Sequence, residues 1–433
     1  MNSVVAALSE LQQKLAAPFP EKSGTYLFTV PLVLRDHSDA LGWLAAQPVW
    51  PHFYWQQRDG ESEIAALGAV QQFSTLSQGQ AFLAGIPEAE DVIICGLNQF
   101  DPASGSLFLP RLLWRRLRGN ATLTLVLHSD DSLARDAQQA SAMLSRLLPE
   151  AALAVQQLTL TATRETPSEP VWHQLINQAL ACFSRGELDK VVLARASDLY
   201  FSEPVCPAAF LAASRRVNLN CYHFYMAFAP GQAFLGSSPE RLWRRRGDQL
   251  RTEALAGTVA NSPDDAQASR LGNWLMNDEK NQRENMLVVE DICQRLSTLG
   301  DALDVLPPQV MRLRKVQHLR RCIWTTLHQP DDACCLQQLQ PTAAVAGLPR
   351  QAARQFIRQF EPFERQWYAG SAGYFSRQQT EFCVSLRSAL VEGNRVRLYA
   401  GAGIVPGSDP GQEWREINNK AAGLRTLLTE KSE

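Results

Sequence analysis

The sequence predicts a soluble protein in which helices are combined with antiparallel β-hairpins. Two stretches have the pattern of a hairpin, with turns near Asp59-Gly60 and at Gly247-Asp248. Elsewhere, apolar residues recur at the spacing of amphipathic helices. Hydrophobic residues make up 45% and charged residues 20% of the 433 positions, so the chain has ample apolar material for a large core.

In chain order, the first expected element is an amphipathic helix in residues 1–15. Short strands and helices then alternate up to residues 161–170, a polar stretch that contains two prolines and marks a seam in the chain. A helical stripe of apolar residues between 172 and 183 ends at Gly186. Lys190 then opens a strand that continues with the apolar residues of "KVVLAR".

The second hairpin places a glutamate beside the segment that follows it. With the two-residue turn given above, Arg246 faces Gln249. Counting back along both strands then places Glu240 opposite Leu255. Glu240 is therefore expected next to the segment "ALAGT".

Two later helices carry acidic residues beside an apolar face. Residues 279–299 predict a helix with Glu284 at the edge of that face, which consists of Met286, Val289, Cys293 and Leu296. The last helix begins with Asp409 as N-cap and Pro410 at its first position. Its buried face consists of Trp414, Ile417, Ala421, Leu424 and Leu428.

Composition excludes several classes of function. Lys and Arg number 42 against 44 Asp and Glu, a net charge of −2, so no basic bias indicates a nucleic-acid partner. No uninterrupted apolar stretch is long enough to span a bilayer, which predicts no membrane partner. The nine scattered cysteines form no Cys-x-x-Cys pattern and favour a reducing compartment. We therefore expect a cytoplasmic protein.

Lys190 needs an explanation, because burying an ammonium group in an apolar strand is unfavourable. The side chain could lie at the strand edge and reach water. It could instead be desolvated for chemistry, since an apolar strand without a close carboxylate favours the neutral amine. The residues around it leave both interpretations open.

Glu413 and Glu416 form a like-charged pair three positions apart on the last helix. One interpretation is a solvated helix face, on which Lys420 neutralises Glu416 from the next turn. The other is a site for a divalent cation, since carboxylate and water ligands suit a hard ion such as Mg²⁺. Glu284 would be a further ligand if the two helices meet.

Two glycine-containing stretches, residues 368–374 and 399–407, could bring bare backbone N–H groups to an anion, although such stretches are more often tight turns. Neither matches a nucleotide-binding motif. Arg387 lies in an apolar strand, where its guanidinium needs a carboxylate or phosphate partner. His318, by contrast, is interpreted as a histidine that packs in the core with its hydrogen bonds satisfied.

These features together resemble the chorismate-utilising enzymes, a family that includes anthranilate, aminodeoxychorismate, salicylate and isochorismate synthases. The segments that carry the resemblance follow the family order through residues 186–424. They are "GELDKVVLAR", "FLGSSPERL", "TEALAGT", "ENMLVVEDI", "VQHL", "QPTAAVAGLPR", "YAGSAGY", "CVSLR" and "YAGAGIVPGSDPGQEWREINNKAAGL".

The resemblance implies an α+β fold, with two central antiparallel β-sheets packed together and helices on the outside. Residues 1–433 would form a single chorismate-binding domain, made of an N-terminal portion (1–165) and a catalytic portion (171–433). The polar stretch at 161–170 would then be a long surface connection.

The resemblance also implies a site for chorismate and Mg²⁺. Glu284 and Glu416 would bind the metal, with Glu413 nearby or acting through water, and the ring carboxylate of chorismate would lie on the metal. The second carboxylate would be held by a group made of Arg387, Tyr368 and the backbone of Gly401 and Gly403. The other implied substrate-binding residues are Leu255, Ala256, Gly257, His318, Ala344 and Lys420.

In isochorismate synthases, a lysine at the position of Lys190 activates water for attack on C2, and a glutamate at the position of Glu240 protonates the departing C4 hydroxyl. Glu240 must then hold a proton at neutral pH, so its pKa is expected to be raised. Lys190 favours water over ammonia as the nucleophile. Ala256 stands where aminodeoxychorismate synthases have a nucleophilic lysine, so no glutaminase partner is expected.

Within the family, the N-terminal "FYWQQRDG" and the overall length are similar to the isochorismate synthases of menaquinone biosynthesis. Salicylate synthases share Lys190 and Glu240 and add a pyruvate-eliminating step, and siderophore-pathway isochorismate synthases share the chemistry, so both remain alternatives. A non-catalytic chorismate-binding protein is a third alternative. Such a protein should have lost the base, the acid or a metal carboxylate, and none is missing here.

Overall fold

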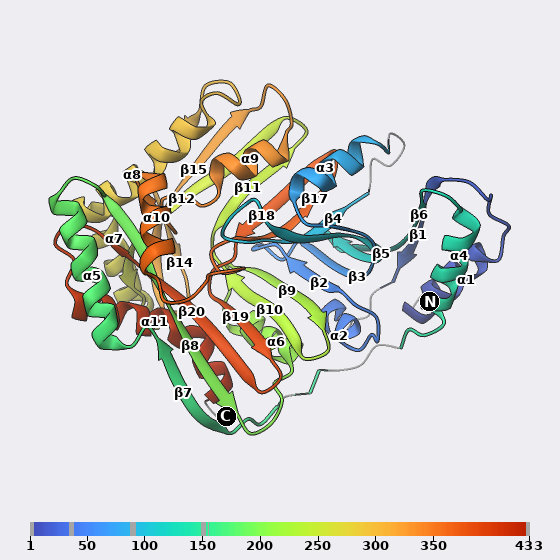
Figure 1. The fold of residues 1–433 in the computed structure, drawn as a ribbon, viewed down its shortest axis with the longest axis horizontal. Coiled ribbons are helices and arrows are strands. Elements are labelled where there is room, and N and C mark those ends of the chain that lie inside the picture. The colour runs from blue at the N-terminus through green and yellow to red at the C-terminus, as the bar shows by residue number, and fades with distance from the viewer. Residues whose placement is uncertain (1–3, 34–38, 87–91, 149–152, 155, 430–433) are drawn as a thin grey trace.

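The computed structural model describes residues 4–33, 39–86, 92–148, 153–154 and 156–429, which form eleven helices and twenty strands (Figure 1). The helices are α1 (Val4–Leu15), α2 (Ala40–Ala45), α3 (Leu76–Ala84), α4 (Leu133–Leu144), α5 (Glu169–Ser184), α6 (Pro207–Val217), α7 (Asp265–Asn277), α8 (Glu279–Leu296), α9 (Asp332–Leu339), α10 (Arg350–Phe360) and α11 (Pro410–Thr429).

The first ten strands are β1 (Gly24–Leu32), β2 (His52–Gln56), β3 (Ser62–Phe73), β4 (Ile94–Asn98), β5 (Gly105–Leu117), β6 (Asn120–Ser129), β7 (Leu160–Thr166), β8 (Lys190–Phe201), β9 (Tyr222–Ala229) and β10 (Gln232–Ser238). The others are β11 (Arg241–Arg246), β12 (Gln249–Ala260), β13 (Asp304–Val305), β14 (Gln309–Arg312), β15 (Val316–Thr326), β16 (Gly347–Leu348), β17 (Ser371–Phe375), β18 (Gln379–Val384), β19 (Ser388–Glu392) and β20 (Arg395–Ile404).

The strands form one hydrogen-bonded, antiparallel sheet with two branches that share β5. One branch runs in the order β1-β6-β5-β3-β2-β9-β10-β19-β20-β8, and β7 and β16 pair with β8. The other runs in the order β5-β4-β17-β18-β11-β12-β15, and β13 and β14 pair with β15. Strand β5 can serve both branches because its first residues pair with β4 and its last residues with β6.

The main hydrophobic core lies between the two branches. Trp55 of β2 in the first branch contacts Tyr374 of β17 in the second, with ring centroids 5.2 Å apart. Helices α5, α10 and α11 share a separate apolar cluster with β8 and β20, and α1, α2, α4 and α6 cover the first branch with another. Each large apolar side chain that is fully buried contributes about 1.5–3 kcal/mol of transfer free energy. The predicted α+β fold with helices outside is confirmed, and the two predicted sheets are the two branches of this one antiparallel sheet, packed against each other.

The two predicted hairpins are present. Strands β2 and β3 pair up to Gln56 and Glu63, so the chain turns at the predicted Asp59-Gly60. Strands β11 and β12 pair with Arg246 opposite Gln249, as counted from the sequence. Glycine suits that turn because Gly247 has φ +57°, a conformation that L side chains rarely adopt. The ladder of this hairpin stops before Glu240 and Leu255, which both face the cavity described below.

Most of the predicted helices are also present, with one face assigned incorrectly. Helix α1 fills the predicted N-terminal helix from Val4 onward, α5 ends just before Gly186, and α11 begins at Pro410. The predicted first residues, 1–3, lie outside the described part of the chain. In α8, Met286 is exposed rather than buried, because the helix packs through a neighbouring stripe formed by Asn285, Val288, Val289, Ile292 and Leu296.

The polar seam at 161–170 is more ordered than a surface connection. Its first half belongs to strand β7, which pairs with β8 at the edge of the sheet. Most side chains of β7 are exposed, which explains why the segment has the polar composition of a loop. The division into portions 1–165 and 171–433 stays a prediction. Strand pairs such as β2–β9 and β4–β17 join the two portions and support a single domain.

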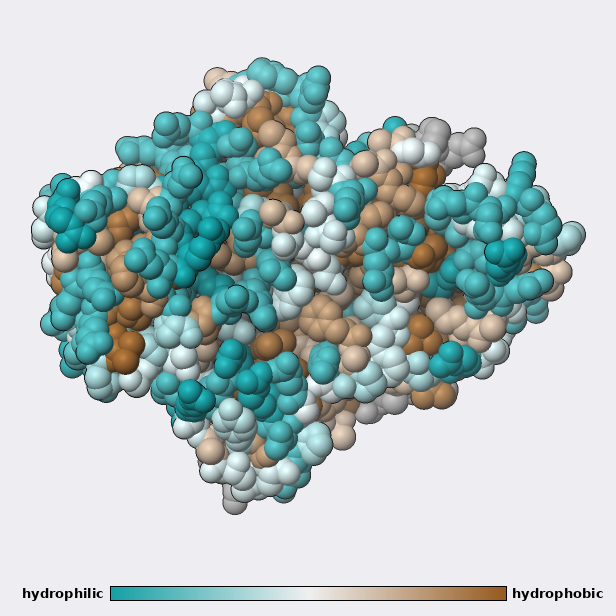
Figure 2. Space-filling model, in the orientation of Figure 1, coloured by the Kyte–Doolittle hydropathy of each residue, from teal (hydrophilic) through white to brown (hydrophobic). Residues whose placement is uncertain are grey.

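The surface is mixed in character. Figure 2 shows hydrophilic residues gathered around α10, with smaller hydrophobic groups elsewhere on the same face. Among the helices that the structure describes, none is both long and apolar enough to cross a membrane. All nine cysteines fall within the described residues, and all are free thiols.

Candidate active site

A cavity of about 910 Å³ opens where β8, β12 and β20 meet α8 and α11. All fifteen residues that the sequence analysis assigned to catalysis, substrate or metal line this one cavity. They come from segments scattered between Lys190 and Lys420, so the fold brings together what the sequence separates. Concave sites of this size are typical of small-molecule binding.

Lys190 is the first residue of β8, and only 1% of it is exposed. The interpretation as a strand-edge lysine that reaches solvent is therefore wrong. The expectation that no carboxylate lies close to it is also wrong, because its Nζ is 3.2 Å from Oε1 of Glu284. This ion pair offsets part of the desolvation cost of the ammonium group.

Glu240 lies directly before β11 and is 3% exposed. Burial, and then the negative charge of Glu253, raise the pKa of Glu240 to about 8, although Lys190 and Arg58 oppose the shift. The predicted raised pKa is thus present, and the carboxyl group holds its proton at neutral pH. A buried carboxyl of this kind can donate a proton to a ligand in the cavity.

The two glutamates of α11 have pKa values shifted in opposite directions. Burial, and then repulsion from Glu416, raise the pKa of Glu413 to about 7. Glu416 forms an ion pair of 2.6 Å with Lys420, and this lysine lowers the pKa of Glu416. The ion pair of the solvated-face interpretation is therefore present, but both glutamates also line the cavity.

The donor set fits a hard divalent cation in its chemistry. Glu284, Glu413 and Glu416 face one cavity, and the mutual repulsion of the two α11 carboxylates would be relieved by a cation between them. As the side chains stand, no three His, Cys, Asp or Glu groups within the described residues are close enough to form a metal site. Instead, Lys190 forms an ion pair with Glu284, and Lys420 forms one with Glu416.

Arg387 is the cation best placed to receive an anion, although it lies in the connection between β18 and β19 and not in a strand as predicted. Its backbone has φ +47°, which is costly for a residue with a side chain. Its Nη2 is 3.4 Å from Nε2 of His318, and among the described residues no carboxylate lies within 4 Å of its guanidinium. Burial, and then the charge of Arg387, lower the pKa of His318 to about 3, so this imidazole is neutral. Its Nδ1 contacts Oγ1 of Thr258 at 2.9 Å, so His318 is packed with its hydrogen bonds satisfied and also lines the cavity.

Two glycines of β20 leave room for functional side chains to lie close to the backbone of the cavity wall. A Cβ on Gly401 would lie 2.7 Å from the hydroxyl of Tyr368, and a Cβ on Gly403 would lie 3.3 Å from Cε of Lys190. The stretch at 399–407 therefore forms a strand followed by a turn, and the tight-turn interpretation is wrong for Gly401 and Gly403.

The sequence analysis missed cavity residues at the start of α8, among them Lys280 and Asn281. The side-chain Oδ1 of Asn281 accepts a hydrogen bond of 3.0 Å from the backbone of Thr258 and so holds the "ALAGT" segment against the helix. Helical spacing could have revealed both residues, because Lys280 is one turn before Glu284 and Asn281 precedes it by three positions.

The cavity therefore combines a buried amine, a protonated carboxyl, hard oxygen donors and an arginine that has no carboxylate partner among the residues described. This combination defines an enzyme that performs acid–base chemistry on a small carboxylate substrate. The chain belongs to the chorismate binding enzyme family, whose family model matches residues 97–429.

Comparison with individual relatives shows which members of this family the chain resembles. It is 62% identical to isochorismate synthase MenF of Escherichia coli over 428 residues, which cover 99% of both chains. It is 40% identical to isochorismate synthase MenF of Haemophilus influenzae, over 99% of this chain and 98% of the relative. The solved structure of MenF, the menaquinone-specific isochorismate synthase from Escherichia coli, has a TM-score of 0.97 and covers 99% of this chain and 100% of that chain. Anthranilate synthase component I from Streptococcus pneumoniae shares the fold, with a TM-score of 0.64, 17% identity, and coverage of 90% of this chain and 95% of that one.

Proposed function

We propose that this protein is an isochorismate synthase of menaquinone biosynthesis, which converts chorismate to isochorismate. The observation that carries the proposal is a buried lysine and a protonated carboxyl in one cavity, Lys190 and Glu240. Full-length identity of 62% to a menaquinone-specific isochorismate synthase supports the pathway. Because water is the nucleophile, the reaction needs no ammonia and no glutaminase subunit.

The reaction exchanges one hydroxyl group of chorismate for another. Lys190, as the neutral amine, takes a proton from a water molecule that attacks C2. The ring double bonds shift, and Glu240 gives its proton to the hydroxyl that leaves C4 as water. Atoms balance, because one water enters and one departs, and both groups then exchange protons with solvent. Glu240 loses its proton as the pH rises through its pKa of about 8, so activity should fall above that pH.

Substrate binding follows from the remaining charges of the cavity. Arg387 and Tyr368 would hold one carboxylate of chorismate near β20. We propose that Glu284 and Glu416 hold Mg²⁺, with Glu413 bound directly or through water. When bound, the ion supplies positive charge for the other substrate carboxylate. To bind the ion, the carboxylate of Glu284 must break its ion pair with Lys190, and this also frees the amine of Lys190.

A product analysis tests the proposed reaction. The purified protein is incubated with chorismate and Mg²⁺, and the products are separated by chromatography. We expect isochorismate without pyruvate. Salicylate with an equal amount of pyruvate would identify the protein as a salicylate synthase, and unchanged chorismate would identify a non-catalytic binding protein.

A chelation experiment tests the metal separately. Excess EDTA is expected to abolish turnover, and Mg²⁺ in excess over EDTA to restore it. Glu416→Gln removes a proposed ligand and should raise the Mg²⁺ concentration needed for half-maximal activity, whereas the exposed Glu290→Gln on α8 should not. Full turnover in EDTA would contradict the metal proposal.

A further inference from the structure

An ion pair from the N-terminal hairpin lies next to Glu240. Arg58 is in the turn between β2 and β3, and its guanidinium meets the carboxylate of Glu253 on β12. The two contacts are 2.6 Å from Nη1 to Oε1 and 3.0 Å from Nη2 to Oε2, which is the bidentate geometry of a strong pair. The side chain of Glu253 has no exposed surface, and that of Arg58 is 11% exposed.

The same pair holds the chain on both sides of Glu240. Nη1 of Arg58 donates a hydrogen bond of 2.7 Å to the carbonyl oxygen of Pro239, the residue before Glu240. Oε1 of Glu253 accepts a hydrogen bond of 2.8 Å from the backbone N–H of Arg241, the residue after it. One ion pair therefore fixes the peptide groups that flank the carboxyl, although neither Arg58 nor Glu253 lines the cavity.

The charges around Glu240 come from several elements. Glu253 on β12, Lys190 on β8 and Arg58 in the hairpin turn act on it directly. Arg241 follows Glu240 in sequence and pairs with Glu381 of β18 at 3.2 Å. Despite burial, Arg58 and Arg241 hold the pKa of Glu253 below its ordinary value, so Glu253 is ionised at neutral pH. Of the two charges in the pair, Glu253 acts on Glu240 more strongly than Arg58.

We propose that Arg58 and Glu253 are positioning residues of the active site, which hold the carboxyl of Glu240 in the cavity by clamping the peptide groups on both sides of it. The inference rests on the proposed function for the role of Glu240 as the acid. A second consequence is electrostatic: the anion of Glu253 helps to keep the proton on Glu240, and Arg58 limits that effect.

Titration of Glu240 without substrate tests the electrostatic part. The protein is labelled with ¹³C at the glutamate carboxyl carbons, and the resonance of Glu240 is the one that is lost in Glu240→Gln. We expect a midpoint near 8 in the wild type. In Glu253→Gln the midpoint should fall by about 1 pH unit or more, because a negative neighbour is lost and Arg58 remains. In the double variant Arg58→Met/Glu253→Gln it should lie between those two values.

Kinetics test the positioning part. Arg58→Lys keeps the positive charge but cannot hold Glu253 and the carbonyl of Pro239 with the same fork of donors. It should lower kcat by about 10-fold or more, because a small misplacement of a catalytic group is costly, while KM for chorismate stays within about threefold. The midpoint of Glu240 should stay near that of the wild type.

Asp136→Asn is the matched control. Asp136 and Arg111 form a bidentate pair of 2.6 Å contacts with 9% exposure on each side, and neither residue lines the cavity. This variant should lower the melting temperature but leave kcat and the titration of Glu240 unchanged.

Three outcomes would overturn the proposal. The first is a wild-type kcat in Arg58→Lys, and the second is a midpoint of the double variant below that of Glu253→Gln. The third is failure of all three variants to fold while Asp136→Asn folds, which would make the pair purely structural. If only Glu253→Gln fails to fold, the double variant must still titrate below the wild type. The titration does not require turnover, so a wild type that makes no isochorismate would contradict the proposed function and leave the titration result intact.

Discussion

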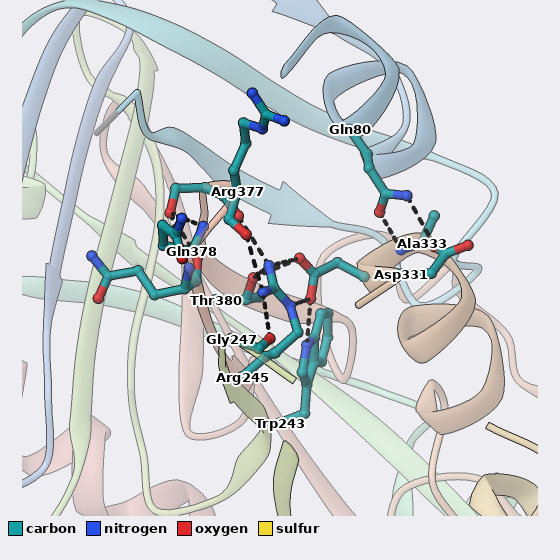
Figure 3. A network of polar contacts seen from close by, with 12 residues as sticks. Gln80, Trp243, Arg245, Gly247, Asp331, Ala333, Arg377, Gln378 and Thr380 are labelled. Carbon is teal, nitrogen blue, oxygen red and sulfur yellow. Dashed lines mark hydrogen bonds and ion pairs between the residues drawn. The ribbon is translucent and has the colours of Figure 1, made fainter. Parts of the chain in front are cut away.

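Two buried arginines of this protein, Arg245 and Arg387, differ in what surrounds them. Arg245 on β11 makes two contacts with the carboxylate of Asp332, 3.0 Å from Nε and 2.7 Å from Nη2. It also donates to Thr380 and to the backbone oxygen of Gly247, while Trp243 donates to the same Asp332 (Figure 3). Every charge in this network is matched by protein groups, and the cluster joins β11, β18 and α9.

Arg387 has no such set of partners. The one hydrogen-bond contact of its guanidinium among the described residues is the long one to His318, and burial lowers the pKa of Arg387. A buried guanidinium whose charge is matched by protein groups needs no ligand, whereas one that faces a cavity without a carboxylate partner is a candidate for binding an anion.

The largest expected effect is the loss of activity when a charged residue of the cavity is replaced. Lys190→Ala and Glu240→Gln should each lower kcat by about 10²- to 10⁴-fold, because each removes a general acid or base. The double variant should lose less than the product of the two losses, since both groups act in one transition state. Steady-state rates at saturating chorismate measure this, with the exposed Lys14→Ala as control. A Lys190→Ala enzyme within a few-fold of the wild type would show that Lys190 is not the base.

Breaking the network around Arg245 should lower the free energy of unfolding and leave catalysis unchanged. Asp332→Asn leaves the buried Arg245 without its carboxylate and should cost about 3–5 kcal/mol of unfolding free energy. Urea denaturation measures the loss, and kcat at a temperature where the variant is folded should stay within about twofold of the wild type. A large fall in kcat in the folded variant would show that the network is coupled to the cavity.

Glu240 should also lower the free energy of unfolding, by an amount that depends on pH. The pKa of Glu240 is about 8 in the folded protein against 4.5 for an ordinary glutamate, so the folded state binds its proton more tightly. Stability from this proton is fully present below about pH 4.5 and is lost as the pH rises through about 8. Glu240→Gln cannot ionise and should be more stable than the wild type at pH 7, by on the order of 3 kcal/mol.

Urea denaturation at pH 5 and pH 8 checks this sign, and the gap between Glu240→Gln and the wild type should widen at the higher pH. Glu290→Gln, on an exposed position of α8, should show no such widening. A gap that narrows with rising pH would mean that Glu240 is not held protonated.

The smallest expected effect is the change in kcat/KM when Arg387 is replaced. Arg387→Ala should lower kcat/KM by about 10²-fold, because it removes a charge-assisted contact to a substrate carboxylate. Arg387→Lys should recover part of the loss, since it keeps the charge without the fork of donors. An unchanged kcat/KM in folded Arg387→Ala would mean that the unmatched arginine does not bind the substrate.

Much of the fold follows from local patterns. The hairpin turn at Gly247 needs only a residue that tolerates positive φ, and the start of α11 needs only the cap Asp409, whose Oδ1 accepts from the backbone of Gln412 at 2.8 Å. Such signals act over a few residues, so they can be read before any tertiary contact is known. The membership of the site could be predicted too, because family motifs lie in order along the chain.

The tertiary structure decided the partners of the charged side chains. Lys190 and Glu284 are 94 positions apart, and Arg58 and Glu253 are 195 positions apart, so neither pair leaves a periodic signal. Which stripe of α8 is buried was also settled by packing, since Met286 and Val288 fit an apolar face equally well in the sequence but only Val288 is buried. Local physics thus specified the elements and the candidate residues. The register of the sheet and the packing of α8 and α11 specified which charges are matched, because those contacts exist only after distant segments meet.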